Sequence, residues 1–139
     1  MKKTLCIIII LTCFFIVRCD SKTYHWSFYQ SQSEIINLSI IDANNPFEFT
    51  TLKEISMSLK NTLISDIEKL EYKKYGPNLH TTHGVCILIE FKNGEYDIIS
   101  HYEPMHVMWD SESGNLDAKI SWLKCDKKQF DALIDKYMQ

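Results

Sequence analysis

The clearest alternation of apolar and polar positions lies in residues 85–102. Two runs rich in β-branched and aromatic residues, 85–91 and 96–102, flank Asn93 and Gly94. Asn and Gly both tolerate the positive φ angles of a type I′ turn, so this stretch predicts a β-hairpin. The first run is apolar at almost every position, which is typical of a strand covered on both faces near the middle of a sheet.

Three further segments have the features of strands. The even-numbered positions of residues 35–41 are all apolar, and a cluster of turn formers follows. Residues 105–109 and 118–123 predict a second hairpin around a polar turn. Trp122 lies on the alternating apolar face of the last segment, so we expect it in the core.

Two segments show the spacing of an amphipathic helix. Thr51 and Glu54 fit a capping box, and apolar residues then recur at helical spacing, at Leu52, Ile55, Leu59 and Leu63. We therefore expect a helix over residues 51–64, with an extension to residue 70 left open. The final helix begins at Asp126, a capping residue, and its apolar stripe consists of Phe130, Leu133, Ile134 and Tyr137.

The order of these elements is strand, helix, four strands in two hairpins, then helix. It favours an α+β fold of two layers, in which an antiparallel sheet of about five strands has two helices packed on one face. The length of 139 residues and the absence of an internal repeat fit one folded unit. We place that unit at residues 34–139, after a tether or edge segment at residues 19–33 and a leader at residues 1–18.

The leader has the plan of a signal peptide. Lys2 and Lys3 form a short cationic region, and residues 5–17 are apolar except for Thr12. This run is shorter than the roughly 20 apolar residues that a membrane-spanning helix needs. We therefore expect the leader to direct export from the cytoplasm.

Cys19 comes directly after the leader and is followed by polar residues. The arrangement resembles the processing site of bacterial lipoproteins, in which such a cysteine is acylated and becomes the mature N-terminus. Arg18 stands where that family has a small residue, so the site is atypical. The resemblance covers residues 1–22 and implies lipid attachment at Cys19 and a membrane-anchored location in the cell envelope, facing the periplasm or the exterior. The alternatives are processing at Cys13, ordinary cleavage with secretion, and an uncleaved anchor.

Removal of the leader makes the chain more acidic. The remaining residues include twelve lysines and eighteen acidic residues, which is a net charge of −6 with neutral histidines. Such a domain repels the phosphates of nucleic acids and anionic lipids. We therefore expect no nucleic-acid partner, and we expect membrane attachment through the lipid rather than through a basic patch.

Two of the five cysteines, Cys86 and Cys125, lie in the folded unit beyond the lipid-attachment position. In an oxidising compartment we expect them to form a disulfide, which would close a loop of about 40 residues and stabilise the fold by roughly 3–4 kcal/mol. The alternative is two separate buried thiols, which behave as small apolar side chains.

Several residue clusters were considered as catalytic or metal sites. His80, His83 and Cys86 are spaced three residues apart and are candidate zinc ligands. Zinc sites usually pair ligands across a longer loop, and no second pair follows, so a polar loop entering a strand is favoured. A cysteine nucleophile would use Cys86 or Cys125 with a histidine, namely His83, His101 or His106. An acid–base site would use Asp97, His101 and Glu103. We expect low reactivity of Cys86 within an apolar strand, and we expect neither cluster to be catalytic.

Binding therefore suits the sequence better than catalysis. The candidate partner-binding residues are aromatic side chains that supply rigid contact area: Tyr72, Tyr75, Tyr102 and Trp109. We expect a small, non-enzymatic envelope lipoprotein that binds a protein or peptide and needs no cofactor. An immunity-type inhibitor of a basic toxin is one such case, because acidic surfaces steer cationic partners. The alternatives are a hydrolase or metal-dependent enzyme that uses the His80, His83 and Cys86 region, and a small-molecule binder.

Overall fold

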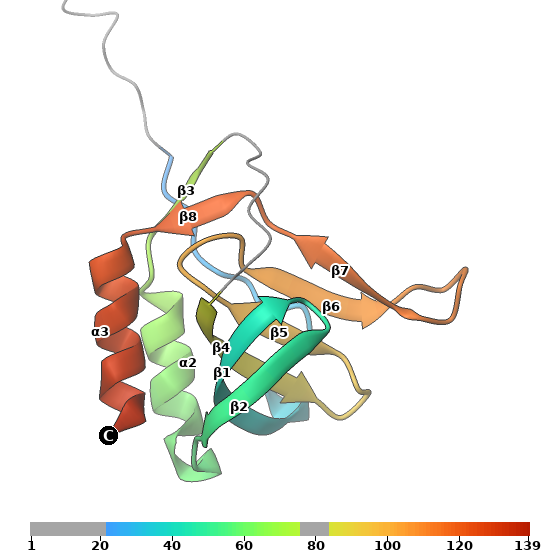
Figure 1. Ribbon diagram of the computed structural model, residues 1–139, viewed down its shortest axis with the longest axis horizontal. Coiled ribbons are helices and arrows are strands. Elements are labelled where there is room, and N and C mark those ends of the chain that lie inside the picture. The colour runs from blue at the N-terminus through green and yellow to red at the C-terminus, as the bar shows by residue number, and fades with distance from the viewer. Residues whose placement is uncertain (1–21, 76–83) are drawn as a thin grey trace, which may run out of the picture.

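The computed structural model describes residues 22–75 and 84–139, whose fold is mixed α and β (Figure 1). Within these residues, a 3₁₀ turn at Gln32–Glu34 precedes the following elements in order: β1 Ile35–Asn45, β2 Glu48–Glu54, a 3₁₀ turn at Met57–Leu59, α2 Lys60–Glu68, β3 Tyr72–Lys74, β4 Gly84–Phe91, β5 Tyr96–Ile99, β6 Met105–Trp109, β7 Leu116–Ile120, β8 Leu123–Cys125 and α3 Lys127–Met138. Six strands pair antiparallel in the order β2-β1-β4-β5-β6-β7, and β3 pairs with β8. The α+β character and the antiparallel sheet are confirmed, whereas the sheet has six strands in place of about five.

The central hairpin is confirmed as β4 and β5. Its turn contains Gly94, whose φ of +83° is in the region that glycine adopts without strain. The Asn93 side chain also accepts a hydrogen bond from the backbone N–H of Glu95 at 3.0 Å. Strand β4 pairs with β1 on one side and with β5 on the other, so it lies inside the sheet as its continuous apolar run predicts. The second arm ends at Ile99, three residues earlier than expected.

The predicted helix start at Thr51 is wrong, because the α-helix α2 begins nine residues later, at Lys60. Residues 48–54 form β2, in which Thr51 pairs with Ile41 of β1. The strand β1 is longer than its alternating pattern indicates, and the Asn45 side chain accepts from the N–H of Phe47 at 2.9 Å to close a turn into β2. Pairing with β1 satisfies backbone groups along the whole segment, which outweighs one local capping pattern. The helix α2 begins later, after Ser56 caps the preceding 3₁₀ turn.

The final helix is confirmed. Its start is capped by the Asp126 side chain, which accepts from the N–H of Gln129 at 3.0 Å. The four residues of the predicted apolar stripe are all buried, namely Phe130, Leu133, Ile134 and Tyr137. Helices α2 and α3 lie side by side in Figure 1, and their buried residues join one hydrophobic cluster with one face of the sheet.

The sheet is buried on both faces. Ile40 and Ile87 point into the cluster that contains the helices, whereas their neighbours Ile41 and Leu88 point into a second cluster on the opposite face. The edge strands β2 and β7 supply partly buried side chains to this second cluster: Phe49, Leu116, Ala118 and Ile120. The long apolar strands therefore contribute side chains to two separate cores, one on each face of the sheet.

The segment predicted as a single strand over residues 118–123 is divided. The strand β7 ends at Ile120, and the chain then leaves the large sheet so that β8 pairs with β3. Trp122 lies between the two strands and is 46% exposed, so its predicted place in the core is wrong. Its alternating pattern with Ala118 and Ile120 is broken by this change of sheet.

The segment before β1 packs against the domain from Tyr24 onward. Tyr24 exchanges two backbone hydrogen bonds with Tyr72 of β3, each 2.8 Å long. Trp26 is buried in the larger core. The described part of the predicted tether or edge segment thus brings an aromatic residue into the interior.

Candidate functional site

The four predicted partner-binding aromatics do not lie together. Tyr72 is fully buried, and its hydroxyl donates to the carbonyl oxygen of Ser100 at 2.9 Å, so its prediction as an exposed contact residue is wrong. The pairing of β3 with β8 turns this side chain into the core, and burial raises the pKa of its hydroxyl. Tyr75 and Tyr102 stack on each other at 4.6 Å beside the β3–β8 pair. Trp109 lies elsewhere, at the end of β6.

Cys86 and Cys125 are both buried in this fold. Cys86 is fully buried, and burial together with the nearby Asp42 raises the pKa of its thiol to about 12. Burial also raises the pKa of the Cys125 thiol, to about 11. Thiols with such pKa values carry little thiolate at neutral pH and are poor nucleophiles. Neither cysteine therefore has the exposed, low-pKa environment that is typical of a nucleophilic thiol.

The predicted disulfide is absent from the structure. Cys86 and Cys125 are both thiols, and they belong to different hydrophobic clusters on the two faces of the large sheet. The alternative interpretation, two separate buried thiols that pack as small apolar side chains, describes their environment.

The candidate metal ligands His80 and His83 lie outside the described residues. Among residues 22–75 and 84–139, no group of three histidine, cysteine or acidic side chains is arranged to hold a metal ion.

The predicted acid–base group is divided among three places. His101 lies beyond the end of β5, with its ring 6.1 Å from that of Phe130 on α3. Glu103 is buried, has a φ of +56° and accepts a hydrogen bond from the Tyr75 hydroxyl. Asp97 pairs with a different histidine, because His106 stands directly opposite it on β6.

The Asp97 and His106 side chains form the best-defined polar pair in the described chain. Oδ1 of Asp97 and Nδ1 of His106 are 2.6 Å apart, and the carboxylate is almost fully buried. Trp26 donates its ring N–H to the other carboxylate oxygen at 3.3 Å and places its ring 4.4 Å from the imidazole. Burial raises the pKa of Asp97, although the hydrogen bonds from His106 and Trp26 act in the opposite direction.

The carboxylate of Glu95, next to this pair, connects three segments of the chain through hydrogen bonds. Glu95 accepts from the side-chain amide of Gln30 at 2.6 Å and from the backbone N–H of Trp109 at 3.1 Å. Burial alone would raise its pKa, but the hydrogen bonds from Trp109, Asn93 and Gln30 lower the pKa of Glu95 below its usual value. The ring N–H of Trp109 donates to the carbonyl oxygen of Asn93 at 3.0 Å.

These contacts connect two exposed aromatic residues, Tyr29 and Trp109, through one network of side chains, although His106 and Trp109 point to opposite faces of β6. We name this network the Trp109 surface and define it by its members, Tyr29, Asn93, Glu95, His106 and Trp109. Tyr29 and Trp109 are 54% and 51% exposed, and the Tyr29 ring lies 5.4 Å from that of His106. Rigid Tyr and Trp side chains supply contact area at low entropic cost. Sequence reasoning identified Trp109 but did not join Tyr29 and His106 to it, because side-chain contacts of Trp26 and Gln30 with the β4–β5 hairpin bring the Tyr29 segment to this site.

A hollow of about 440 Å³ lies between α3 and the start of β4, where a small-molecule binder would place its ligand. Its walls include the charged side chains of Lys127, Asp131 and Asp135 beside the apolar Phe130 and Ile134. Val85 and His101 complete a lining in which apolar and charged side chains are mixed.

No family model, curated protein or solved structure matches this chain. In the residues that the structure describes, neither helix has the length and apolar character that crossing a membrane requires.

Proposed function

We propose that this protein is an exported lipoprotein, held at a membrane through a lipid on Cys19, whose domain binds a protein partner through the Trp109 surface. The domain is non-enzymatic in this proposal, and its fold is best regarded as two layers with α2 and α3 on one face of the sheet. The leader and Cys19 lie outside the described residues, so the resemblance of residues 1–22 to bacterial lipoproteins is what supports the anchor.

The observation that carries the binding proposal is that Trp109 is both exposed and fixed. Its ring N–H is bonded to Asn93, and its backbone N–H is bonded to the buried Glu95 carboxylate. A large exposed aromatic side chain that is already held in place loses little conformational entropy when a partner covers it. Tryptophan and tyrosine in such positions dominate the energetics of many protein interfaces.

The Asp97–His106 pair also supports recognition better than reaction. A histidine acting as a general base must reach a nucleophile or substrate within hydrogen-bond distance. In the described chain, His106 hydrogen-bonds to Asp97 alone, and the two cysteines are buried. The pair instead ties Trp26, and with it the segment that includes Tyr29, to strands β5 and β6.

The partner is expected to be cationic at the face that contacts this domain. The chain from Cys19 onward has a net charge of −6, and Glu95 is an ionised carboxylate beside Trp109. Charge complementarity raises the rate of encounter with a basic partner and suppresses acidic ones. An inhibitor of a basic toxin domain, of the immunity type, fits this description.

A photo-crosslinking experiment with two tryptophan variants tests the proposal. The full chain is expressed in a host that exports and acylates it, with a crosslinking residue at Tyr29, and captured partners are identified by mass spectrometry. Loss of a hot-spot tryptophan costs 2 kcal/mol or more, so Trp109→Ala is expected to reduce capture of the partner about 30-fold. Trp122→Ala is the matched control, because Trp122 is similarly exposed but lies outside the Trp109 surface.

The proposal is contradicted if Trp109→Ala captures the same partner as efficiently as Trp122→Ala does. Circular dichroism of both variants, compared with the parent protein, shows whether either substitution unfolds the domain. Loss of labelling by radioactive palmitate in Cys19→Ala checks the anchor separately, and unchanged labelling would contradict acylation at this residue.

A further inference from the structure

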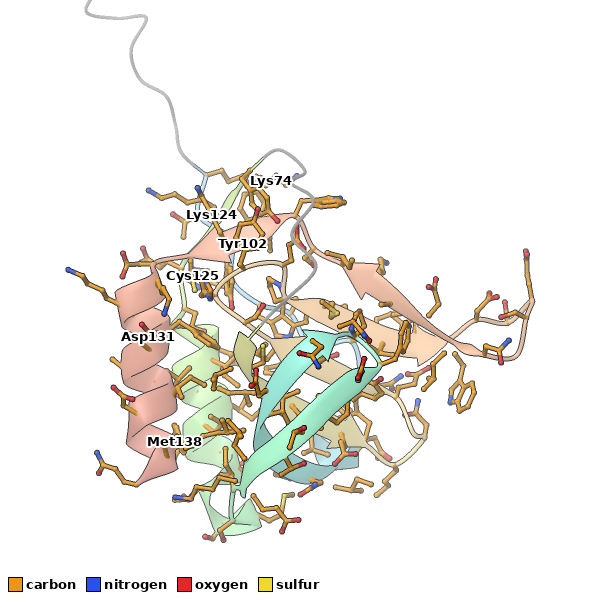
Figure 2. All side chains as sticks on the ribbon, viewed as in Figure 1. Lys74, Tyr102, Lys124, Cys125, Asp131 and Met138 are labelled. Atoms are coloured by element: carbon orange, nitrogen blue, oxygen red, sulfur yellow. The ribbon has the colours of Figure 1, made fainter. Side chains whose placement is uncertain are left out.

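A second surface, at the β3–β8 end of the molecule, gathers lysines in a domain that is acidic as a whole. We name it the Lys124 surface and define it by four exposed lysines and three aromatic residues: Lys22, Lys73, Lys74, Lys124, Tyr24, Tyr75 and Trp122. The lysines come from three segments that are far apart in the sequence. Figure 2 shows Lys74 and Lys124 at the same end of the domain, above α3 and near the point where the described chain begins.

Two of these lysines are in a position that folding alone does not favour. Lys73 of β3 and Lys124 of β8 are directly opposite each other in the antiparallel pair. Like charges in this arrangement repel each other and destabilise a sheet. Such a placement is understandable if an external anionic surface neutralises both charges.

The lysines of the Lys124 surface lack the carboxylate partners that some other lysines of the domain have. In the described chain, Lys69, Lys92, Lys127 and Lys136 each form an ion pair with a carboxylate, whereas Lys60, Lys119 and Lys128 form none. None of the four lysines of the Lys124 surface does so within the described residues. Two acidic residues, Glu71 and Asp126, line a hollow of about 460 Å³ next to Lys73 and Lys124, but neither is within ion-pair distance of them.

The ammonium groups lie against aromatic rings instead. Lys22 and Lys74 place their Nζ atoms 5.3 and 5.2 Å from the centre of the Tyr24 ring. Lys124 lies 6.0 Å from the Tyr75 ring, which meets Trp122 edge-on at 6.5 Å. Lysine stems and amphipathic aromatic rings are the side chains that favour the interface between water and lipid.

The course of the chain indicates which anionic surface this is. The described chain begins at Lys22, inside the Lys124 surface, and residues 1–21 with their apolar leader and Cys19 join the domain there. A lipid on Cys19 would bring this end of the domain, rather than another, next to the headgroups. We propose that the Lys124 surface rests on anionic lipid headgroups of the membrane and so orients the domain.

This inference rests on the membrane anchor of the proposed function but is independent of the protein partner. It also changes an expectation drawn from net charge, because four of the twelve lysines collect at this end of an acidic domain, next to Glu71 and Asp126. The Trp109 surface, at the turn between β4 and β5, shares no residue with the Lys124 surface. A domain held by the lysines could therefore still present Trp109 to a partner.

Tryptophan quenching in reconstituted vesicles tests the proposal. The full chain is placed in vesicles of phosphatidylcholine with phosphatidylglycerol, and a trace lipid with a spin label on its headgroup quenches nearby tryptophans. Two variants retain the buried Trp26 as a common background: Trp109→Phe reports on Trp122, and Trp122→Phe reports on Trp109. Stronger quenching is expected in the variant that retains Trp122.

Neutralising the lysines is expected to remove this difference. Each lysine near an anionic surface strengthens association about fivefold, so replacing Lys73, Lys74 and Lys124 by glutamine weakens contact roughly a hundredfold. Quenching of Trp122 should then fall to the level of Trp109, and it should fall equally in vesicles of phosphatidylcholine alone. Glutamine at three lysines outside the surface is the matched control and should leave quenching unchanged: Lys60, Lys92 and Lys119.

Equal quenching of Trp122 and Trp109 in anionic vesicles would overturn the inference, even if the protein floats with the vesicles. Quenching of Trp122 that persists in neutral vesicles or in the lysine variant would overturn the role of charge. A chain that does not float with anionic vesicles would contradict both this inference and the anchor.

Discussion

Replacement of Asp97 by alanine is expected to destabilise the domain and to loosen the segment that carries Tyr29. The Asp97 carboxylate is 1% exposed and accepts from Nδ1 of His106 at 2.6 Å and from Nε1 of Trp26 at 3.3 Å. Its removal leaves the buried ring N–H of Trp26 without an acceptor, which costs about 1–3 kcal/mol. Loss of the shorter bond to His106 adds about 1 kcal/mol or more.

One opposing effect reduces this total. Burial raises the pKa of Asp97, which means that the folded protein pays a desolvation penalty for the carboxylate that alanine does not carry. We therefore expect Asp97→Ala to lower the free energy of unfolding by about 2–3 kcal/mol at neutral pH. Asp97→Asn keeps the shape and one acceptor, so its loss should be about 1 kcal/mol.

Urea unfolding followed by circular dichroism measures these differences from the midpoints and slopes. Asp131→Asn is the control, because Asp131 pairs with Lys127 at the surface and should change stability by no more than about 0.5 kcal/mol. A double-mutant cycle of Asp97→Ala with Trp26→Phe should give a coupling of about 1 kcal/mol, since both substitutions remove the same bond. A loss below about 0.5 kcal/mol for Asp97→Ala, or full additivity in the cycle, would refute the assigned role.

The pH dependence of the same variants gives a second check. A carboxyl group whose pKa is raised on folding binds its proton more tightly in the folded state. Its favourable contribution is complete below the ordinary value of 3.8 and is lost as the pH rises through the raised pKa of Asp97. The stability of the parent protein should therefore fall relative to that of Asp97→Asn over this interval. A difference that does not change with pH in this interval would contradict the raised pKa.

The remaining predictions concern the thiols and the contact between the helices. Iodoacetamide should leave Cys86 and Cys125 unmodified in the native protein, because both thiols are buried and have raised pKa values. After denaturation without reductant it should modify both cysteines, which peptide mapping measures. Protection of the cysteines in the denatured protein would indicate a disulfide. Asp66→Asn should lower stability at pH 7 by about 1–2 kcal/mol, because Asp66 of α2 accepts from Lys136 at 2.6 Å and Tyr137 at 2.9 Å on α3. Burial alone would raise the pKa of Asp66, but these bonds lower it. The difference in stability between the parent protein and Asp66→Asn, measured by urea unfolding, should therefore shrink as the pH falls below 3.8 and through the lowered pKa. A difference that stays constant over this interval would contradict the lowered pKa.

Elements with a complete local signal could be predicted from the sequence. The turn at Asn93 and Gly94 and the apolar arms beside it define the β4–β5 hairpin, which extends from residue 84 to residue 99. The capping residue Asp126 and the apolar stripe after it likewise define α3. In both cases the residues that determine the element are also its neighbours in the chain, so no distant partner is needed.

The errors arose where a distant segment decided the outcome. Thr51 has the sequence features of a helix start, but the extended β1 offers this segment a strand partner. Tyr72 was expected at the surface but is buried, and Trp122 was expected in the core but is exposed. Both differences arise because the chain leaves the large sheet after β7, so that β8 pairs with β3. A capping residue contributes about 1 kcal/mol, which is less than the pairing of a whole strand.

The same distinction applies to the two proposed surfaces: some of their features follow from the sequence, and others follow only from the fold. The sequence by itself determined the acidic balance of residues 19–139, and it predicted the exposed character of Trp109. Only the tertiary structure decided that His106 pairs with Asp97 and that Lys73 faces Lys124, since each pair is created by strand register between separate segments. Net charge is a sum over all residues and contains no positions. A local pattern extends over only one turn or one strand. Neither therefore indicates which charged side chains become neighbours when the chain folds.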